Sequence, residues 1–337
     1  MNYRNFVGID MSKLWFDAHF LKVDTPKGGH HERFTNDVCG IELFQRWFEG
    51  HCKDELLSTL VVMEHTGVYT IPLCKHLGSK SISYTLIAGI EISKSLGLRR
   101  GKSDKVDSKR IAQYAYKNRD DIRMCLLPDT LLAELKNLLG FRETLVKRRT
   151  GLQVSVKETA EYNSRIDNQY FIDLIKPIID TLNKGIKDLE RKMKEVIAGD
   201  ESLKRNYDLL MSIPGIGLTN TVAFLVYTGN FLLFNDSRKY ASYCGIAPFA
   251  NGSGKTPGKD CVSHFANIRV KTLLTSAAWS ASKWDAEIKL YFERQKEKGK
   301  STGCIINMIR NKLVHKAFSI VKKGEPHQNR CAFHTIK

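Results

Sequence analysis

The stretch Asn5-Phe-Val-Gly-Ile-Asp10, followed closely by Leu14-Trp-Phe-Asp-Ala-His-Phe20, decides the fold of the first third of the chain. The first segment is a short apolar run that ends in an acid. The second alternates apolar and mostly polar side chains, which is the period of a half-buried β-strand. A turn at Asp24-Thr-Pro-Lys-Gly-Gly29 then leads to a third predicted strand over His31–Phe34.

Helix and strand signals alternate from there to residue 117. Asn36-Asp37 is a helix-capping pair, and the residues after it place apolar side chains at helical spacing. The further predicted elements are a strand over Leu56–Met63, a helix over Tyr69–Leu77, a strand over Ser83–Ala88 and a helix over Lys105–Lys117. The resulting order is three strands, helix, strand, helix, strand, helix. This order predicts an α/β RNase H-like fold, a mixed sheet flanked by helices.

The character of the chain changes after about residue 128. Residues 129–200 are rich in charge, and their apolar side chains recur at three- and four-residue steps. This pattern predicts a helical hairpin or coiled-coil arm that contacts another protomer, or else helices packed on their own domain. Residues 201–325 are mostly helical with glycine-rich loops, and residues 326–337 form a loosely ordered tail. We therefore expect three domains, 1–128, 129–200 and 201–325.

Composition points to a polyanionic partner. The 337 residues carry a formal net charge of +17, spread along the whole chain. Proteins this basic usually bind nucleic acid and less often an anionic membrane. The eight cysteines show no metal-binding spacing and indicate reduced thiols. No signal peptide or run of 18 apolar residues is recognisable, so we expect a cytoplasmic protein without a membrane span.

Four acids in the first third stand where a two-metal nuclease needs them. Asp10 and Glu64 each end an apolar predicted strand, whereas Asp104 and Asp107 lie three residues apart at a helix start and share one face. Each acid alone is better explained by a turn, a strand end or a helix terminus. Together they predict a site for Mg²⁺, or Mn²⁺ in vitro, because clustered carboxylates repel one another unless cations neutralise them.

Basic residues and glycine loops predict nucleic-acid contacts. A basic segment adjoins the acids, and it is either a solvated face or a phosphate-binding surface; its candidates are Arg99, Arg100, Lys102, Lys105 and Lys109. The loop Ser212-Ile-Pro-Gly-Ile-Gly217 resembles a helix-hairpin-helix turn, in which the N–H groups of Gly215 and Gly217 bind a phosphate, or it is an ordinary interhelical turn.

A second glycine-rich loop contains an exposed hydroxyl. In Gly245–Lys259, Ser253 stands between Gly252 and Gly254, with Lys255 and Lys259 nearby. Read alone, this is a flexible polar loop, and its spacing is not that of a Walker P-loop. The stretch that follows starts a basic helix through Arg269 and Lys271, which we also expect to contact nucleic acid.

Taken together, these segments resemble the DEDD transposases of the IS-one-ten group of bacterial insertion sequences, relatives of the Piv-type DNA invertases. The matching segments span nearly the whole chain: Val7-Gly-Ile-Asp10, Glu64-His-Thr-Gly-Val-Tyr69, Lys102-Ser-Asp-Lys-Val-Asp107, Ser212-Ile-Pro-Gly-Ile-Gly217, Gly245-Ile-Ala-Pro248 and Gly252-Ser-Gly254. The resemblance implies a RuvC-like catalytic domain, a helical arm and a C-terminal transposase domain.

The resemblance also implies residue roles and partners. It assigns metal binding and catalysis to Asp10, Glu64, Asp104 and Asp107, and the role of nucleophile to Ser253. It implies double-stranded donor and target DNA, a structured guide RNA, and a homo-oligomer that is a tetramer when active. The chain departs from the family pattern at three positions beside the catalytic candidates and the basic helix: Ser108, Ala266 and Lys271.

Three other functions fit parts of the sequence. A RuvC-like junction endonuclease would use the acids to activate water and would not need Ser253. An actin-like sugar kinase would explain Gly8-Ile9-Asp10 followed by Lys13, but not the high positive charge. A non-catalytic nucleic-acid-binding protein would not depend on the acids.

Overall fold

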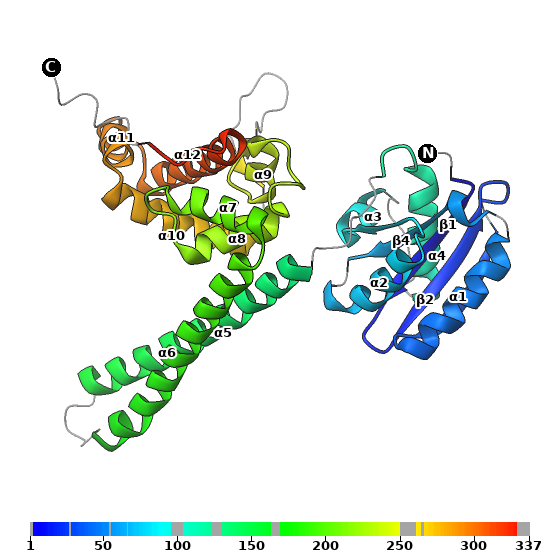
Figure 1. Cartoon of the computed structure of the whole chain (residues 1–337), viewed down its shortest axis with the longest axis horizontal. Helices are drawn as coiled ribbons and strands as arrows, with labels where there is room; N and C mark the ends of the chain where they lie inside the picture. Colours follow the sequence, from blue (N-terminus) through cyan, green and yellow to red (C-terminus); the bar gives the residue numbers. More distant parts are fainter. Residues whose placement is uncertain are drawn as a thin grey trace. The chain divides into compact units, whose positions relative to one another are not determined.

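The chain forms two compact units, Met1–Leu127 and Pro128–Lys337 (Figure 1). The structure is a computed structural model, and it describes residues 3–26, 28–53, 55–65, 67–95, 104–122, 130–162, 169–249, 261–263 and 266–328. Each unit has its own hydrophobic core. The predicted three-domain division remains a prediction, since the arm and the C-terminal helices fall in one unit.

A five-stranded mixed sheet lies at the centre of the first unit. Its strands are β1 (Asn5–Met11), β2 (Trp15–Lys22), β3 (His30–Thr35), β4 (Thr59–Glu64) and β5 (Tyr84–Ile87). They lie side by side in the order β3-β2-β1-β4-β5. The first three strands are antiparallel, whereas β4 runs parallel to β1, and β5 runs parallel to β4. The predicted order of strands and helices is confirmed.

Helices cover both faces of this sheet. One face packs against α1 (Val38–Cys52) and α2 (Ile71–Ser79) in a core rich in phenylalanine. The other face packs against α3 (Gly89–Ser95) and α4 (Asp104–Lys117). Asp37 caps α1 as predicted, because its side chain accepts a hydrogen bond from Gly40 N at 2.8 Å.

Two local expectations are corrected. Leu56–Ser58 forms a 3₁₀ turn, so the fourth strand begins only at Thr59, where the Thr59 hydroxyl donates back to Glu55 O. Gly89–Ser95 forms a short helix, which adds one element to the predicted order between the last strand and the last helix. The first difference concerns an element end, where short-range hydrogen bonds compete with the ladder or helix pattern.

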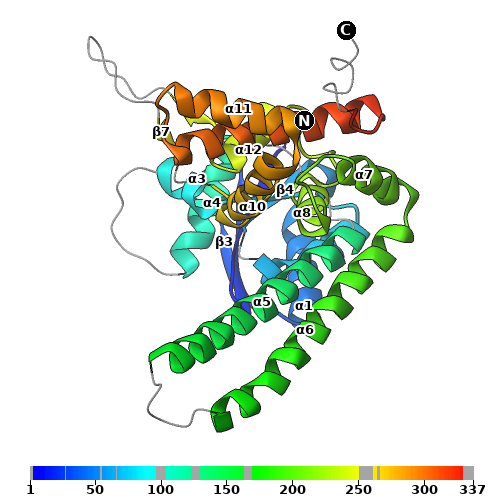
Figure 2. The same cartoon turned by 90° about the vertical axis from the view of Figure 1, so that its left-hand side faces the viewer.

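The second unit is helical, with one short hairpin (Figure 2). Its elements are α5 (Thr130–Tyr162), α6 (Gln169–Ala198), α7 (Glu201–Met211), α8 (Leu218–Thr228), α9 (Ser237–Tyr243), β6 (Pro248–Phe249), β7 (Cys261–Val262), α10 (Ile268–Trp284), α11 (Ala286–Glu297) and α12 (Thr302–Lys323). No helix among the described residues is long and apolar enough to cross a bilayer. The cysteines in these described ranges are free thiols.

The predicted helical hairpin is present as α5 and α6. Arg142 on α5 donates to Glu190 on α6 at 2.7 Å, and Arg149 donates to Asn183 at 3.1 Å. One end of the pair shares the core of the C-terminal helices, whereas the other end, where α5 ends and α6 begins, extends away from that core in both views. One end of the helix pair is therefore packed on its own domain, whereas contact of the other end with another protomer remains a prediction.

Candidate active site

A row of charged side chains crosses one face of the sheet. Asp10 on β1 pairs in register with Asp17 on β2, and Asp17 pairs with Arg33 on β3. On the other side, Ile9 pairs with Met63, so Glu64 at the end of β4 stands next to Asp10. Because side chains alternate between the faces of a strand, all four point to the face that α3 and α4 cover.

Helix α4 brings two further acids to this row. A β-carbon at Gly8 would collide with the backbone of Ala112 and Ser108, so β1 and α4 touch directly. The first turn of α4 contains Asp104 and Asp107, and this contact holds that turn close to the end of β1. Glycine at position 8 therefore decides how near the helix acids come to Asp10.

Asp10 is the electrostatic centre of the site. Its pKa is raised from 3.8 to about 6, first by burial and then by the negative charges of the four other acids, which are Asp104, Asp107, Glu64 and Asp17. The other three predicted acids therefore each lie close enough to Asp10 to disfavour its charge. Such repulsion is relieved when a cation binds between the carboxylates.

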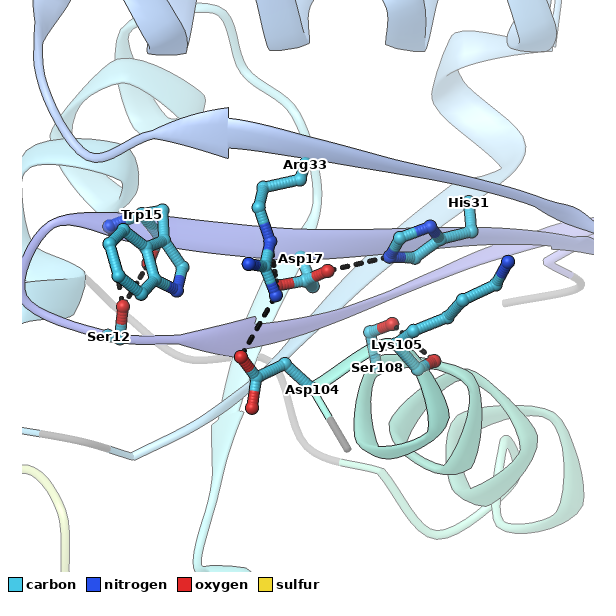
Figure 3. Close-up of polar contacts among 8 residues, drawn as sticks. All are labelled: Ser12, Trp15, Asp17, His31, Arg33, Asp104, Lys105 and Ser108. Carbon is cyan, nitrogen blue, oxygen red and sulfur yellow. Dashed lines mark hydrogen bonds and ion pairs between the residues drawn. The ribbon is translucent and has the colours of Figure 1, made fainter. Parts of the chain in front are cut away.

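The two helix acids each bind an arginine in this arrangement. Asp104 accepts a hydrogen bond from Arg33 Nη2 at 2.9 Å, and Asp107 accepts one from Arg110 at 2.7 Å. Figure 3 shows Arg33 between Asp17 and Asp104, with His31 on the other side of Asp17. Positive charge from the protein thus compensates two of the four carboxylates.

Asp17, His31 and Arg33 were not predicted as site residues. Asp17 is almost completely buried, and it binds His31 Nε2 at 2.6 Å and Arg33 at 2.8 Å. These residues occupy the polar positions of alternating strands, which we took to face solvent. The missed signal was that Asp10 and Asp17 are equally spaced from the β1–β2 turn, which pairs them across the two strands.

Glu64 lies against a second glycine. A β-carbon at Gly89, the first residue of α3, would overlap the Glu64 carboxylate. The absence of a side chain at position 89 therefore gives this carboxylate its place beside Asp10. The site consists of acids from β1, β4 and α4. Gly8 allows the close approach of β1 to α4, and Gly89 allows the close approach of α3 to Glu64.

The donor set suits a hard divalent cation, because every candidate ligand is a carboxylate oxygen. Within the ranges that the structure describes, no three His, Cys, Asp or Glu side chains are grouped closely enough to hold a metal ion. In this arrangement Asp104 and Asp107 are each turned toward a guanidinium group. An ion would need one or both of these ion pairs to open.

The predicted nucleophile lies outside the described residues, as do Lys255 and Lys259, but the stem of its loop is defined. β6 and β7 pair as an antiparallel hairpin on either side of residues 250–260. Before β6, the Ile246 carbonyl accepts hydrogen bonds from Asn307 and Asn311 on α12, both at 2.9 Å. The base of the loop is therefore held against the helical core.

The candidate phosphate-binding loop also serves packing. Gly215 has a φ of 90° and lies against the backbone of Ala281 on α10, a position that a side chain would block. Gly217 caps α8 without a side-chain hydrogen bond. The tight interhelical turn is thus required by the fold, and phosphate binding by this loop remains a prediction.

An open groove of about 950 Å³ lies between α5, α8 and α10. Arg269 lines it and forms an ion pair with Glu143, while Lys136, Arg142 and Lys147 add positive charge. Phe141 and Ile268 also line the groove, and their side chains are exposed.

The other predicted nucleic-acid contacts are spread over the chain. Lys271 belongs to α10, and Lys105 and Lys109 belong to α4. Arg99, Arg100 and Lys102 lie outside the described residues.

Comparison with known proteins gives a consistent result along the chain. Residues 7–160 match a family model described as a transposase, and residues 207–293 match the model of the IS116/IS110/IS902 transposase family. The chain is 27% identical to the pilin gene-inverting protein of Moraxella bovis, over 97% of this chain and 98% of that protein. It is 24% identical to the transposase for insertion sequence element IS1111A of Coxiella burnetii, over 54% of this chain and 55% of that protein.

Proposed function

This chain belongs to the IS116/IS110/IS902 family of transposases, and we propose that it cuts and rejoins DNA strands with four acids around a divalent ion and Ser253 as nucleophile. An enzyme of DNA recombination is the class that the family implies. The single observation that carries the metal site of this proposal is the convergence of Asp10, Glu64 and the first turn of α4, which strand register and the Gly8 contact bring together.

We infer an RNase H-like catalytic unit. The strand order β3-β2-β1-β4-β5, with β4 parallel to β1, supports this assignment. It puts the ends of two neighbouring strands, with Asp10 and Glu64, beside the first turn of α4. Mg²⁺ is the ion that best suits these ligands; when bound, it stabilises negative charge on a phosphodiester oxygen.

The proposed reaction is a transesterification. The Ser253 Oγ forms a bond to phosphorus, the bond from phosphorus to the 3′ oxygen breaks, and the Ser253 proton is passed on so that a 3′-hydroxyl leaves. The serine–DNA phosphodiester keeps the energy of the broken bond for rejoining. The Asn307 and Asn311 contacts support this role for the loop, because they hold its base in one place.

The proposed partners are double-stranded donor and target DNA, a structured guide RNA and further copies of the chain. The net charge of +17 and the cations around the α5–α8–α10 groove support binding of nucleic-acid backbones. Base pairing by the guide would supply most of the sequence choice, as it does in other RNA-guided systems. Assembly into a tetramer would let acids of one protomer act with Ser253 of another.

Trapping of the covalent intermediate tests the proposal. Wild-type protein incubated with Mg²⁺, guide RNA and labelled DNA should form a covalent protein–DNA adduct on denaturing gels. Ser253→Ala should form none, and Asp10→Asn should form none while still binding RNA. A junction endonuclease, the alternative, would cleave DNA with Ser253→Ala as well as the wild type does and would leave no adduct.

A further inference from the structure

Arg33 connects two acids from different parts of the first unit. Its guanidinium group donates to Asp17 on the neighbouring strand at 2.8 Å and to Asp104 on α4 at 2.9 Å. The two partners differ in environment, since the Asp17 side chain is 1% exposed and the Asp104 side chain 53%. Arg33 therefore has one buried partner and one partner at the edge of the candidate metal site.

Both carboxylate oxygens of the buried Asp17 have partners. One Asp17 oxygen binds His31 and the other binds Arg33, and the Arg33 guanidinium also lies over the Trp15 ring, 5.4 Å from its centroid. Breaking the contact with Asp17 would leave one oxygen of a buried carboxylate without its charged donor, which is less favourable than breaking an exposed pair. When one contact of Arg33 opens, it is the one to Asp104.

The Asp104 oxygen that accepts from Arg33 points toward the guanidinium group, so Arg33 and an ion at this site compete for the negative charge of the same carboxylate. A divalent cation beside Asp10 attracts the same carboxylate with twice the charge of the guanidinium group. The second ion pair, between Asp107 and Arg110, lies within α4, because its partners are three residues apart on that helix. It does not connect the helix to the sheet. The Arg33 bridge, by contrast, connects the first turn of α4 to strands β2 and β3 of the sheet.

We propose that Arg33 is a positioning residue that holds Asp104 in the ion-free protein, and that a divalent ion displaces it from this carboxylate. Asp17 then keeps Arg33 beside the site. This inference rests on the metal site of the proposed function. It assigns Asp17 and Arg33 to that site in addition to the four acids.

The test is the affinity for Mn²⁺ alone, measured on the full chain without nucleic acid by electron paramagnetic resonance. Arg33→Gln removes the charge and the bridge, whereas Arg33→Lys keeps the charge but cannot bridge two acids as a guanidinium group does. Competition for Asp104 predicts that both variants bind Mn²⁺ more tightly, by about two- to five-fold, the range expected for loss of an exposed ion pair. The matched control is Arg4→Gln, which breaks the ion pair with Glu55 and should leave the affinity unchanged.

The possible outcomes distinguish a failure of the Arg33 displacement from a failure of the proposed metal site. If Arg33→Gln binds Mn²⁺ more tightly and Arg33→Lys binds it like the wild type, simple charge repulsion explains the data and the displacement is wrong. It is also wrong if neither variant changes the affinity. If instead Asp10→Asn and Glu64→Gln bind Mn²⁺ as tightly as the wild type, the metal site itself is wrong. Thermal melts check folding, and Arg33→Lys retains a positive partner for Asp17.

Discussion

At the scale of single residues, the fold places Asp10 where its ionised form is unfavourable. Its carboxylate is partly buried and surrounded by four other acids, so the ionised form is disfavoured in the absence of a cation. A residue in such a position contributes little to stability as a bare carboxylate. Its environment instead favours a bound cation, which is the property that the proposed function requires.

The pH dependence of unfolding follows from this shift. The pKa of Asp10 is about 6 in the fold and 3.8 in the unfolded reference, so between these values the folded chain binds the proton more tightly. In EDTA, the Asp10 contribution to the free energy of unfolding should therefore rise as the pH falls from 7 toward 4. Asp10→Asn lacks this contribution.

Urea unfolding of the wild type and of Asp10→Asn at pH 5 and pH 7 measures how the free energy of unfolding of each protein changes with pH. His19, whose pKa burial lowers to about 4, acts in the opposite direction but is present in both proteins and cancels. Identical pH dependence of the wild type and Asp10→Asn would contradict the Asp10 assignment.

Gly89 offers a sharp test of how Glu64 is placed. Gly89→Ala would put a methyl group where the Glu64 carboxylate lies, and the flexible carboxylate is the part that can move. We expect Mn²⁺ affinity and strand cleavage to fall at least about ten-fold, with the free energy of unfolding changed by less than about 1 kcal/mol. Gly50→Ala is the matched control, because it is a helical glycine with open space around it. Equal loss in both variants would argue against the Glu64 contact.

At the scale of elements, the contact between β1 and α4 connects the core to the site. Ile111, Ala112 and Ala115 of α4 pack on Phe6 and its neighbours, and the same contact orients the first turn of the helix. The amphipathic pattern of α4 was readable in the sequence. The distance between α4 and β1 could not be predicted from the sequence. That distance depends on Gly8, and the role of Gly8 is visible only when the helix is placed over the strand.

Gly8→Ala should therefore act on stability as well as on the site. The new methyl group meets backbone atoms of Ser108 and Ala112, which cannot turn away as a side chain can. Overpacking of this kind costs about 1–3 kcal/mol or more. Denaturant unfolding of the variant against the wild type gives the loss directly. Unchanged stability would mean that α4 does not contact β1 as described.

At the scale of the whole molecule, the distal arm presents apolar side chains to solvent. Tyr170, Phe171, Leu174 and Ile178 recur along α6 at three- and four-residue steps, and each is about half exposed or more. A stripe of this kind favours contact with another helix. A second copy of the chain is the partner that the predicted homo-oligomer requires.

Disrupting this stripe should weaken self-association without unfolding the protein. We expect Leu174→Glu combined with Ile178→Glu to shift the oligomer toward smaller species in light scattering after size exclusion, with an unchanged circular dichroism spectrum. Leu232→Glu, at another highly exposed leucine, provides the control. An unaltered mass for the double variant would show that the arm is not the protomer contact.

The sequence by itself determined most of the strands and helices of the first unit and indicated the four candidate acids, because strand alternation, helix spacing and capping are local properties that neighbouring residues carry. Only the tertiary structure decided which side chains meet. Asp17 and Arg33 belong to polar positions of alternating strands, and nothing local shows that α4 covers that face or that Asp104 reaches Arg33. Such contacts depend on strand register and helix placement, which long-range packing sets.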